Sequence, residues 1–304
     1  VIKGLFCHLY IIRHEETIEN PYDPILVAKK YREVFGKLKS SLPDIFGESE
    51  EILLDPQSIQ FLDGELGKID FLKNDRDPFG DLYEVFIGTG VREEEGQFFT
   101  PKNGIDLLVS MVDPQPHEKM IDPACGAGGF LTSIILHLNG NVLAYEKLQG
   151  NLFGVDKDQY LAKLASTHIA LLTMSTGYIS CGDSLAWANK EGETLSLEKE
   201  GAYDVVVTNP PFGKKIVAAS KEIQKTYDLG YKWKLDKSSK TYSKTDTLQR
   251  SVPPQVLFVE KCIRLLKPGG RLGIVLPESL ITSTSYGYVV QYIQEHCHIK
   301  AVMG

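Results

Sequence analysis

The stretch VVVTNPPFGKK, residues 205–215, decides the fold that this sequence predicts. Its first four residues are apolar or nearly so and indicate a buried strand. Two consecutive prolines follow, and neither has an amide hydrogen to donate to a sheet ladder. The strand must therefore stop at Thr208, in a rigid corner that carries the amide side chain of Asn209 and the ring of Phe212.

The segments on either side of this corner alternate between strand and helix patterns, which is typical of a parallel α/β sheet. Strands are expected at 119–124, 152–155, 178–181, 203–208 and 271–276, with the start of a sixth at 299–303. Helices are expected at 105–111, 130–138, 159–174, 254–266 and 286–295. Ligands of open parallel sheets bind at the carboxyl edge of the strands, so functional residues are expected there.

The first part of the chain has a different pattern. Asp23 and Pro24 fit an N-cap and a first helical turn, and apolar residues recur at helical spacing until Leu42-Pro43. A helix is therefore expected within 21–46, and short apolar segments favour further helices within 50–90. We predict an N-terminal helical domain over residues 1–92 and a catalytic domain over 93–304.

A glycine-rich turn follows the strand expected at 119–124, in the stretch MIDPACGAGGF at 120–130. Glycines let the backbone approach a ligand without a Cβ in the way, and the N-terminus of the next helix suits a carboxylate or a phosphate. The dinucleotide fingerprint G-x-G-x-x-G is absent. Asp122 would repel a pyrophosphate but could accept from an ammonium group, so a ligand with an amine and a carboxylate matches better.

The next two strands also end in acidic residues. An acid in the place of Asp156 commonly accepts hydrogen bonds from ribose hydroxyls, and Asp183 could accept from the exocyclic amine of an adenine. Each acid alone also fits a routine helix N-cap. Three successive strands that end in aspartate beside a glycine loop point to a ligand with an adenosine and an amino acid, S-adenosylmethionine.

These motifs occur in the order found in adenine-N6 DNA methyltransferases: EEGQFFTP at 94–101, then DPACGAGGF, GVDKD, GDS and NPPF. Residues 77–304 resemble the modification subunit of type I restriction–modification systems, in the N-6 DNA methylase family. The resemblance implies an α/β, Rossmann-like class I S-adenosylmethionine-dependent methyltransferase fold with a mostly parallel sheet in the order 3-2-1-4-5-7-6. The NPPF tetrapeptide alone is less specific, because protein-glutamine and some RNA methyltransferases share it.

The resemblance also implies roles for individual residues. The matches to residues 97–102 cover the methionine end of the cofactor, while the glycine loop and Asp156 hold its amino acid and ribose. The expected cofactor-binding residues are Gln97, Phe98, Phe99, Thr100, Pro101, Lys102, Asp122, Gly126, Ala127, Gly128, Gly129, Asp156 and Asp183. The expected catalytic residues are Asn209, Pro210, Pro211 and Phe212.

The NPPF corner suits transfer to an adenine amine, a poor nucleophile whose lone pair is delocalised. The Asn209 side-chain oxygen and the Pro210 carbonyl would accept its hydrogens and stabilise developing charge, while prolines hold these acceptors in place. Phe212 would stack on an adenine flipped out of the duplex. Direct displacement from a sulfonium needs no metal. Asn209 rather than serine favours adenine-N6 over cytosine-N4 in this family.

Charge is unevenly distributed. The formal net charge is −7, yet ten Lys or Arg face only four acids between Lys214 and Arg250, among four aromatic residues. This segment is predicted to contact DNA; a solvated loop is the alternative. The implied partners are double-stranded DNA, a specificity (S) subunit and, as a further candidate, a restriction (R) subunit. The acidic remainder is a candidate face for a protein partner.

Other features favour a prokaryotic cytoplasmic protein. Five scattered cysteines fit a reducing compartment, and no uncharged apolar run approaches the roughly 20 residues of a membrane span. His296-Cys297-His298 is not expected to bind metal, since strand neighbours point to opposite faces.

The missing last strand and missing initiator Met indicate a fragment. The alternatives are a fused type II restriction–methylation enzyme, a protein-glutamine or RNA methyltransferase, and an inactive DNA-binding scaffold.

Overall fold

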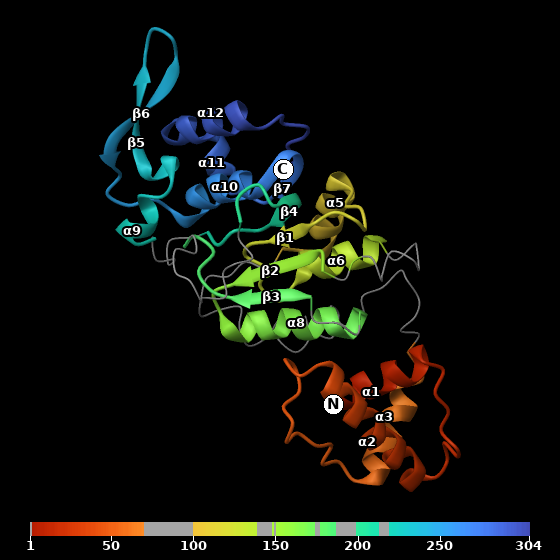
Figure 1. Ribbon diagram of the computed structural model, residues 1–304. Helices are drawn as coiled ribbons and strands as arrows, with labels where there is room; N and C mark the ends of the chain where they lie inside the picture. Colours follow the sequence, from red (N-terminus) through yellow and green to blue (C-terminus); the bar gives the residue numbers. More distant parts are fainter. Residues whose placement is uncertain are drawn as a thin grey trace.

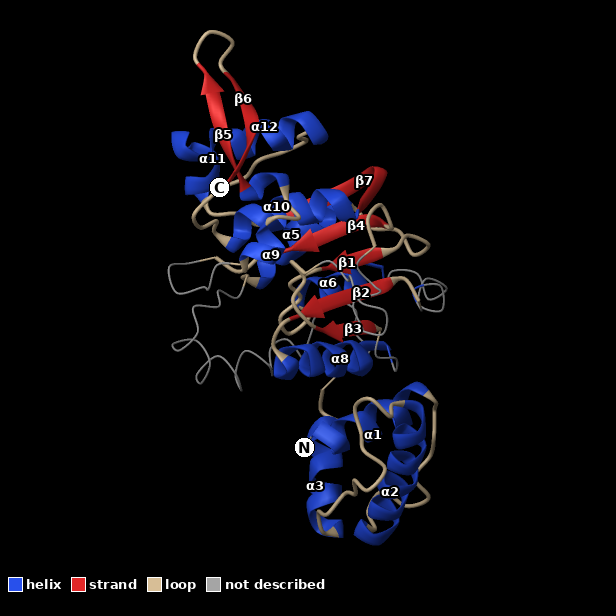
Figure 2. Ribbon diagram, turned by 60° about the vertical axis from the view of Figure 1, so that its left-hand side comes forward, coloured by secondary structure: helices blue, strands red, loops and turns tan. Residues whose placement is uncertain are grey.

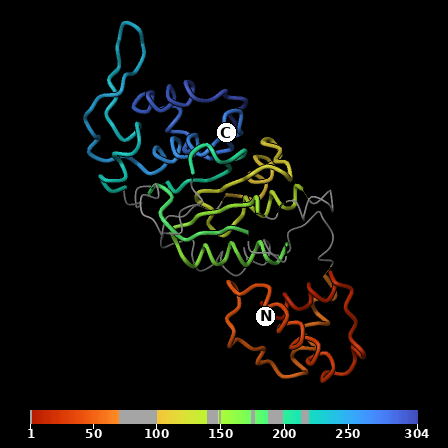
Figure 3. The backbone as a smooth tube through the Cα atoms, viewed as in Figure 1, coloured from red at the N-terminus to blue at the C-terminus, as the bar shows by residue number. Residues whose placement is uncertain are grey.

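The computed structural model describes residues 2–69, 100–138, 148, 150–173, 177–186, 199–212 and 219–304. Within these ranges a unit of three helices comes first, and a parallel sheet with helices follows it (Figure 1). Figure 3 traces the same path as a tube, from the helical unit at the N-terminus to the end of the chain. The expected domain boundary at residues 92 and 93 lies outside the described residues, so it stays a prediction.

The N-terminal unit consists of α1 (Ile2–Arg13), α2 (Pro24–Ser41) and α3 (Pro56–Leu66). The expected start of α2 is confirmed: the Asp23 side chain accepts from the amide of Ile25, with Pro24 at the first helical position. The helices bury one apolar core among them, which includes Phe6, Tyr31 and Phe35. Both ribbon views place this unit beyond α8, away from the centre of the sheet (Figures 1 and 2).

The sheet has five strands, all parallel, in the order β3-β2-β1-β4-β7. They are β1 (Met120–Asp122), β2 (Leu152–Asp156), β3 (Tyr178–Cys181), β4 (Tyr203–Thr208) and β7 (Leu266–Ile274). Met120 of β1 pairs with Leu152 of β2 on one side and with Val205 of β4 on the other. The predicted α/β class and the order of the first five strands are confirmed.

Helices cover both faces of this sheet. Met120, Val205 and Val207 pack in one core with α5 (Lys102–Val112), α6 (Gly129–Leu138) and α8 (Gln159–Thr173). Their neighbours Ile121 and Val206 point the other way and pack with α10 (Pro254–Leu265). Because both faces of β4 are covered, its sequence is a continuous apolar run rather than an alternating one.

Two expectations about the last strands are wrong. β7 begins at Leu266 rather than at 271, because the chain forms a bulge there: Tyr203 pairs with Leu266, whereas Val205 pairs with Arg271. The Pro-Gly-Gly sequence, expected to stand between helix and strand, lies in this bulge. Residues 299–303 form no strand, since the described part of the sheet ends at β7 and a strand needs a neighbour to pair with.

Residues 221–248 of the basic segment after β4 form regular elements, so a plain solvated loop is the wrong description of this part. It forms α9 (Lys221–Gln224), a 3-10 turn (Asp228–Gly230) and an antiparallel hairpin of β5 (Tyr231–Asp236) and β6 (Thr241–Leu248). After β7 come α11 (Glu278–Thr282), a 3-10 turn (Thr284–Tyr286) and α12 (Gly287–His296). Figure 2 shows the hairpin standing out from the body next to α12.

None of the described helices has both the length and the apolar character needed to cross a membrane.

Candidate functional site

The carboxyl ends of the parallel strands bring the predicted site residues to one edge of the sheet. Asp122 ends β1, Asp156 ends β2, and Asn209 directly follows β4. Asp183 comes two residues after β3. β1 pairs with both β2 and β4, so these strand ends are neighbours in the sheet. The structure confirms the strands that bring these residues to one edge. That they bind a ligand there remains a prediction.

The glycine loop between β1 and α6 has two left-handed residues with different surroundings. A Cβ on Gly128, at φ +88°, would lie 3.2 Å from the Cβ of Ala165, so this glycine allows α8 to pack closely. A Cβ on Gly126, at φ +52°, would meet no atom within 4 Å. Gly126 therefore leaves open space beside the loop, where a ligand would meet no Cβ.

Asp156 holds this loop in place. Its Oδ2 accepts from the amide of Gly126 at 2.8 Å, and its Oδ1 accepts from the amide of Asp158 at 2.8 Å. Burial raises the pKa of the Asp156 carboxyl, and the two backbone amides oppose that rise. The end of β2 is thus tied to a glycine 30 residues earlier, a role that the sequence alone did not indicate.

Asp122 is more deeply buried than the sequence suggested, at 1% exposure. Its Oδ1 accepts from the amide of Ala124 at 3.0 Å, which shapes the start of the glycine loop. Burial raises the pKa of Asp122 to about 7, the charge of Asp156 acts in the same direction, and the hydrogen bond from the amide of Ala124 opposes it. Near neutral pH this carboxyl therefore exists in both protonation states.

Asp183 is anchored by its own loop. Its Oδ1 accepts from the amide of Leu185 at 3.1 Å, and its Oδ2 lies 3.1 Å from Lys157 Nζ. The next residue, Ser184, donates to the carbonyl of Pro123 at 2.5 Å, which joins this loop to the glycine loop. Sequence reasoning missed Lys157, although it directly follows Asp156. Cys181, at the end of β3, is exposed.

The NPPF corner is joined to the segment before α5. Asn209 Nδ2 donates to Thr100 Oγ1 at 2.8 Å, across 109 residues of sequence. Pro210 is buried, and Pro211 and Phe212 are half-buried. Thr100 of the FFTP stretch and Asn209 of the NPPF corner therefore meet through their polar side chains.

The other residues expected at the cofactor lie in the glycine loop, at the start of α5 or outside the described residues. Pro101 is the N-cap residue of α5, and Lys102 Nζ pairs with Asp106 Oδ2 at 2.7 Å on the surface of that helix. Gln97, Phe98 and Phe99 lie outside the described residues. Ala127 is buried in the glycine loop, and Gly129 begins α6.

The His-Cys-His stretch lies at the end of α12: His296 is the last residue of the helix, and Cys297 is its C-cap. His296 Nδ1 lies 2.8 Å from the carbonyl of Tyr292, so this ring bonds its own helix. Over the ranges that the structure describes, no group of three or more His, Cys, Asp or Glu is arranged to hold a metal ion.

The five-stranded order, the glycine loop and the acids at the strand ends define a class I S-adenosylmethionine-dependent methyltransferase fold. A solved structure from Listeria monocytogenes, described as such a methyltransferase, aligns with a TM-score of 0.55 and 21% identity over 98% of this chain and 80% of its own. The methyltransferase subunit of a type I restriction–modification system from Streptococcus thermophilus aligns with a TM-score of 0.51 and 18% identity over 95% of this chain and 58% of its own.

The family is narrower than the fold. Residues 74–304 match the family model described as N-6 DNA Methylase, so the chain belongs to the N-6 DNA methylase family. The StySPI type I restriction enzyme methylase subunit of Salmonella potsdam is 25% identical over 279 residues, which cover 87% of this chain and 48% of the relative. The chain spans about half the length of the curated relatives it matches.

Proposed function

We propose that this chain carries the catalytic part of a DNA methyltransferase that transfers a methyl group from S-adenosylmethionine to N6 of adenine, as the modification subunit of a type I restriction–modification system. The observation that carries the proposal is the hydrogen bond between Asn209 Nδ2 and Thr100 Oγ1 at 2.8 Å. It joins two motifs that the family resemblance assigns to the target amine and to the cofactor, and it does so at the carboxyl edge of the sheet.

This bond sets the orientation of the Asn209 amide. With Nδ2 turned toward Thr100, Oδ1 lies at the opposite end of the amide group, and an amine that approaches that end meets an acceptor. The Pro210 carbonyl is the second acceptor. Both stand on a corner that two prolines make rigid, so little reorganisation is needed when the amine gains positive charge. Phe212 supplies a ring for stacking with the base.

The residues of the sheet edge fit an adenosine that carries an amino acid. Gly126 offers open space at a backbone amide region, and Asp156 and Asp183 offer carboxylates at adjacent strand ends. The Asp183–Lys157 pair is exposed on its lysine side, and exposed pairs contribute only about 0–1 kcal/mol, so a ligand can replace Lys157 at little cost. When bound, S-adenosylmethionine supplies a methyl carbon activated by its sulfonium.

The proposed partners follow from the relatives. The relatives from Salmonella potsdam and Escherichia coli are named as methylase subunits of type I restriction enzymes, and the word subunit implies further chains in those enzymes. We therefore propose double-stranded DNA as substrate, a specificity subunit that selects the site, and a restriction subunit as a further partner. A fused type II enzyme would need no separate specificity subunit, so dependence on that subunit separates the two.

The test is methyl transfer by the complete protein to unmethylated duplex DNA, with and without the specificity subunit, followed by nucleoside analysis for N6-methyladenine. Asn209→Ala is expected to lower the rate by about 10²–10³, the usual effect of removing one group that stabilises transition-state charge. Binding of S-adenosylmethionine, measured by calorimetry, should change far less. No cofactor binding by the folded parent protein, or an unchanged rate in Asn209→Ala, would overturn the proposal.

Thr100 allows a finer test. Thr100→Val keeps the shape of the side chain and removes the acceptor for Asn209 Nδ2, so kcat should fall roughly 10-fold, as for a lost hydrogen bond of 1–1.5 kcal/mol. Thr100→Ser keeps the hydroxyl and should recover most of the rate. If the valine variant raises only KM for S-adenosylmethionine and leaves kcat unchanged, Thr100 does not orient Asn209.

A further inference from the structure

The two faces of the β5–β6 hairpin have different surroundings. Trp233 and Tyr242 lie on one face, and their rings contact the Tyr288 ring of α12 with centroids 6.1 and 6.4 Å apart. Trp233 also lies 6.5 Å from the ring of Tyr292. Successive residues of a strand point to opposite sides, so Lys232 and Lys234 point away from α12. The face with Trp233 and Tyr242 thus packs against α12, and the opposite face is exposed to solvent.

The exposed face and the tip carry a group of lysines: Lys232, Lys234, Lys237 and Lys240, here called the hairpin lysines. All four are exposed, and none makes an ion pair with another described residue. The lysine on the other face, Lys244, instead bonds Asp228 at 2.5 Å. Lys232 and Lys234 are about 7 Å apart on β5, and Lys237 and Lys240 lie in the turn that follows it. Positive charge is therefore spread along the hairpin, with Asp236 as the one acid between these four lysines.

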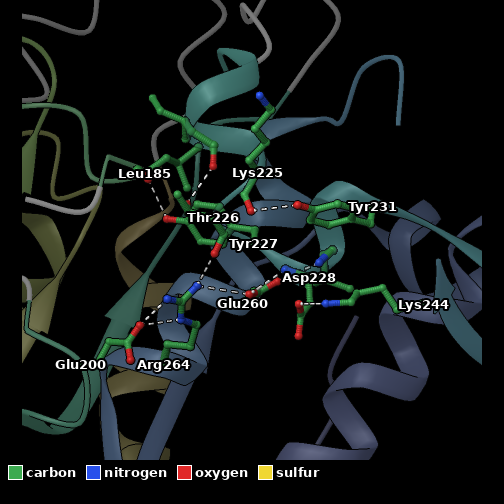
Figure 4. A network of polar contacts seen from close by, with 12 residues as sticks. Leu185, Glu200, Lys225, Thr226, Tyr227, Asp228, Tyr231, Lys244, Glu260 and Arg264 are labelled. Atoms are coloured by element: carbon green, nitrogen blue, oxygen red, sulfur yellow. Dashed lines mark hydrogen bonds and ion pairs between the residues drawn. The ribbon is translucent and has the colours of Figure 1, made fainter. Parts of the chain in front are cut away.

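The base of the hairpin is fixed to the catalytic unit by a polar network (Figure 4). Glu260 of α10 accepts from the amides of Asp228 at 3.0 Å and Leu229 at 2.8 Å. Arg264, one helical turn later, donates to the carbonyl of Thr226 at 2.7 Å. Since these groups hold the backbone just before β5, the base of the strand that carries Lys232 and Lys234 is already in place, and binding has to order mainly the lysine side chains.

A second link reaches the predicted adenine site. The buried Tyr227 hydroxyl donates to the carbonyl of Leu185 at 2.8 Å, and Leu185 in turn donates its amide to Asp183. The hairpin also follows the NPPF corner in sequence and stands on the side toward which β2 and β3 point (Figure 1). A partner held by the hairpin is therefore held near the edge where the methyl group would be transferred.

We infer that the exposed face and tip of the β5–β6 hairpin bind the phosphate backbone of duplex DNA through the hairpin lysines. The inference rests on the proposed function and adds the surface that holds its substrate. The chain has a net charge of −7, so attraction to a polyanion must come from a local cluster such as this one. A two-stranded ribbon also fits a DNA groove. A protein partner would be expected to use aromatic anchors, but Trp233 and Tyr242 pack against α12, and the ring of Tyr231 lies under Lys244.

The experiment compares three forms of the complete protein for binding to a fluorescent DNA duplex between about 50 and 200 mM salt. The first is the parent and the second replaces all four hairpin lysines with glutamine. The third is a matched control with the same change of charge at exposed lysines elsewhere: Lys29→Gln, Lys68→Gln, Lys163→Gln and Lys300→Gln. Thermal unfolding and calorimetric binding of S-adenosylmethionine check that all three are folded and can bind cofactor.

The slope of log K against log salt should fall by about 0.9 for each hairpin lysine that neutralises a phosphate, with affinity at least about tenfold weaker at the lowest salt. The control variant should match the parent. Equal affinity and slope in the hairpin variant and the parent would overturn this inference while leaving the proposed function intact, as would loss of specificity-subunit binding with DNA binding unchanged. If the parent itself neither binds nor methylates DNA, the proposed function is wrong, and the inference about the hairpin is wrong as well.

Discussion

The parallel sheet and the β5–β6 hairpin use the same extended backbone with opposite sequences. Val205, Val206 and Val207 of β4 are fully buried because helices cover both faces of the sheet. In the hairpin only alternate residues such as Trp233 and Tyr242 meet another element, and their neighbours face water. The number of covered faces, rather than any preference of the strand itself, determines which residues each strand contains.

The two regions also treat charge differently. At the sheet edge, Asp122 and Asp156 are drawn into the protein and accept hydrogen bonds from backbone amides. In the hairpin, the hairpin lysines are exposed to solvent. Buried charges can be tuned by their surroundings, which suits chemistry on a bound ligand, whereas exposed charges attract a partner from a distance. The predictions below test this contrast.

The largest effect is expected at Asp122, as a dependence of stability on pH. Its pKa is about 7 in the fold, against about 3.9 in an unfolded chain. The folded state holds this proton more tightly, so the contribution of Asp122 to stability is full below about pH 4 and is lost as pH rises through about 7. Asp122→Asn removes the titration, so urea unfolding should show it gaining up to about 4 kcal/mol relative to the parent between those limits.

Glu118 provides the control with the opposite sign. Its hydrogen bond with Arg271 lowers its pKa, so its contribution to stability is present above the unfolded value of about 4.3 and is lost as pH falls. Glu118→Gln should therefore lose stability relative to the parent at neutral pH and approach it in acid. Parallel pH curves for Asp122→Asn and the parent would mean that Asp122 is not held in a desolvated place.

The next effect compares a small-to-large change in each region. A Cβ on Gly154 of β2 would lie 2.7 Å from Ile179 Cδ1 and 2.8 Å from Leu131 Cδ1, so Gly154→Val should cost about 1–3 kcal/mol of unfolding free energy. Ser243 of β6 is exposed and faces away from α12, and Ser243→Val should stay within about 0.5 kcal/mol. Chemical denaturation measures the unfolding free energy of both variants. Equal losses would show that the two regions do not differ in how tightly they are packed.

The smallest effect concerns the hydrogen bond that connects the hairpin region to the edge of the sheet, from Tyr227 to Leu185. Tyr227→Phe leaves the buried carbonyl of Leu185 without the hydroxyl that donates to it at 2.8 Å, and should cost about 1 kcal/mol. Hydrogen exchange should rise at residues 219–250 before it rises in the sheet. Tyr231→Phe is the matched control, because its hydroxyl donates to an exposed carbonyl at 3.3 Å. Faster exchange in the sheet alone would show that Tyr227 does not hold the hairpin.

The sheet could be predicted because its signals are local. The three valines before Asn209 and the double proline after it fix both the burial of β4 and its end, and the glycine loop marks the turn from β1 into α6. Parallel order then follows from the alternation of strands and helices. The positions of Asp156 and Asp183 at strand ends follow in the same way, since a strand that stops places its next residue at the edge.

What could not be predicted depends on contacts between distant segments. The alternation of Tyr231, Trp233 and Leu235 is a strand signal, but α12, which the ring of Trp233 contacts, lies more than 50 residues later. The bond from Asn209 to Thr100 spans 109 residues, and the burial of Asp122 depends on neighbouring strands. A local pattern says that a side chain has a preferred side; it does not say what lies there.

The cysteines provide a practical handle on the site. Cys7, Cys125 and Cys262 are buried, and burial raises the pKa of Cys7 and Cys125 and also that of half-buried Cys297. Cys181 is the one exposed thiol of the five, and it stands two residues before Asp183. A maleimide fluorophore would therefore attach there first and would sit beside the proposed nucleoside position, giving an optical titration of ligand arrival in the unmutated protein.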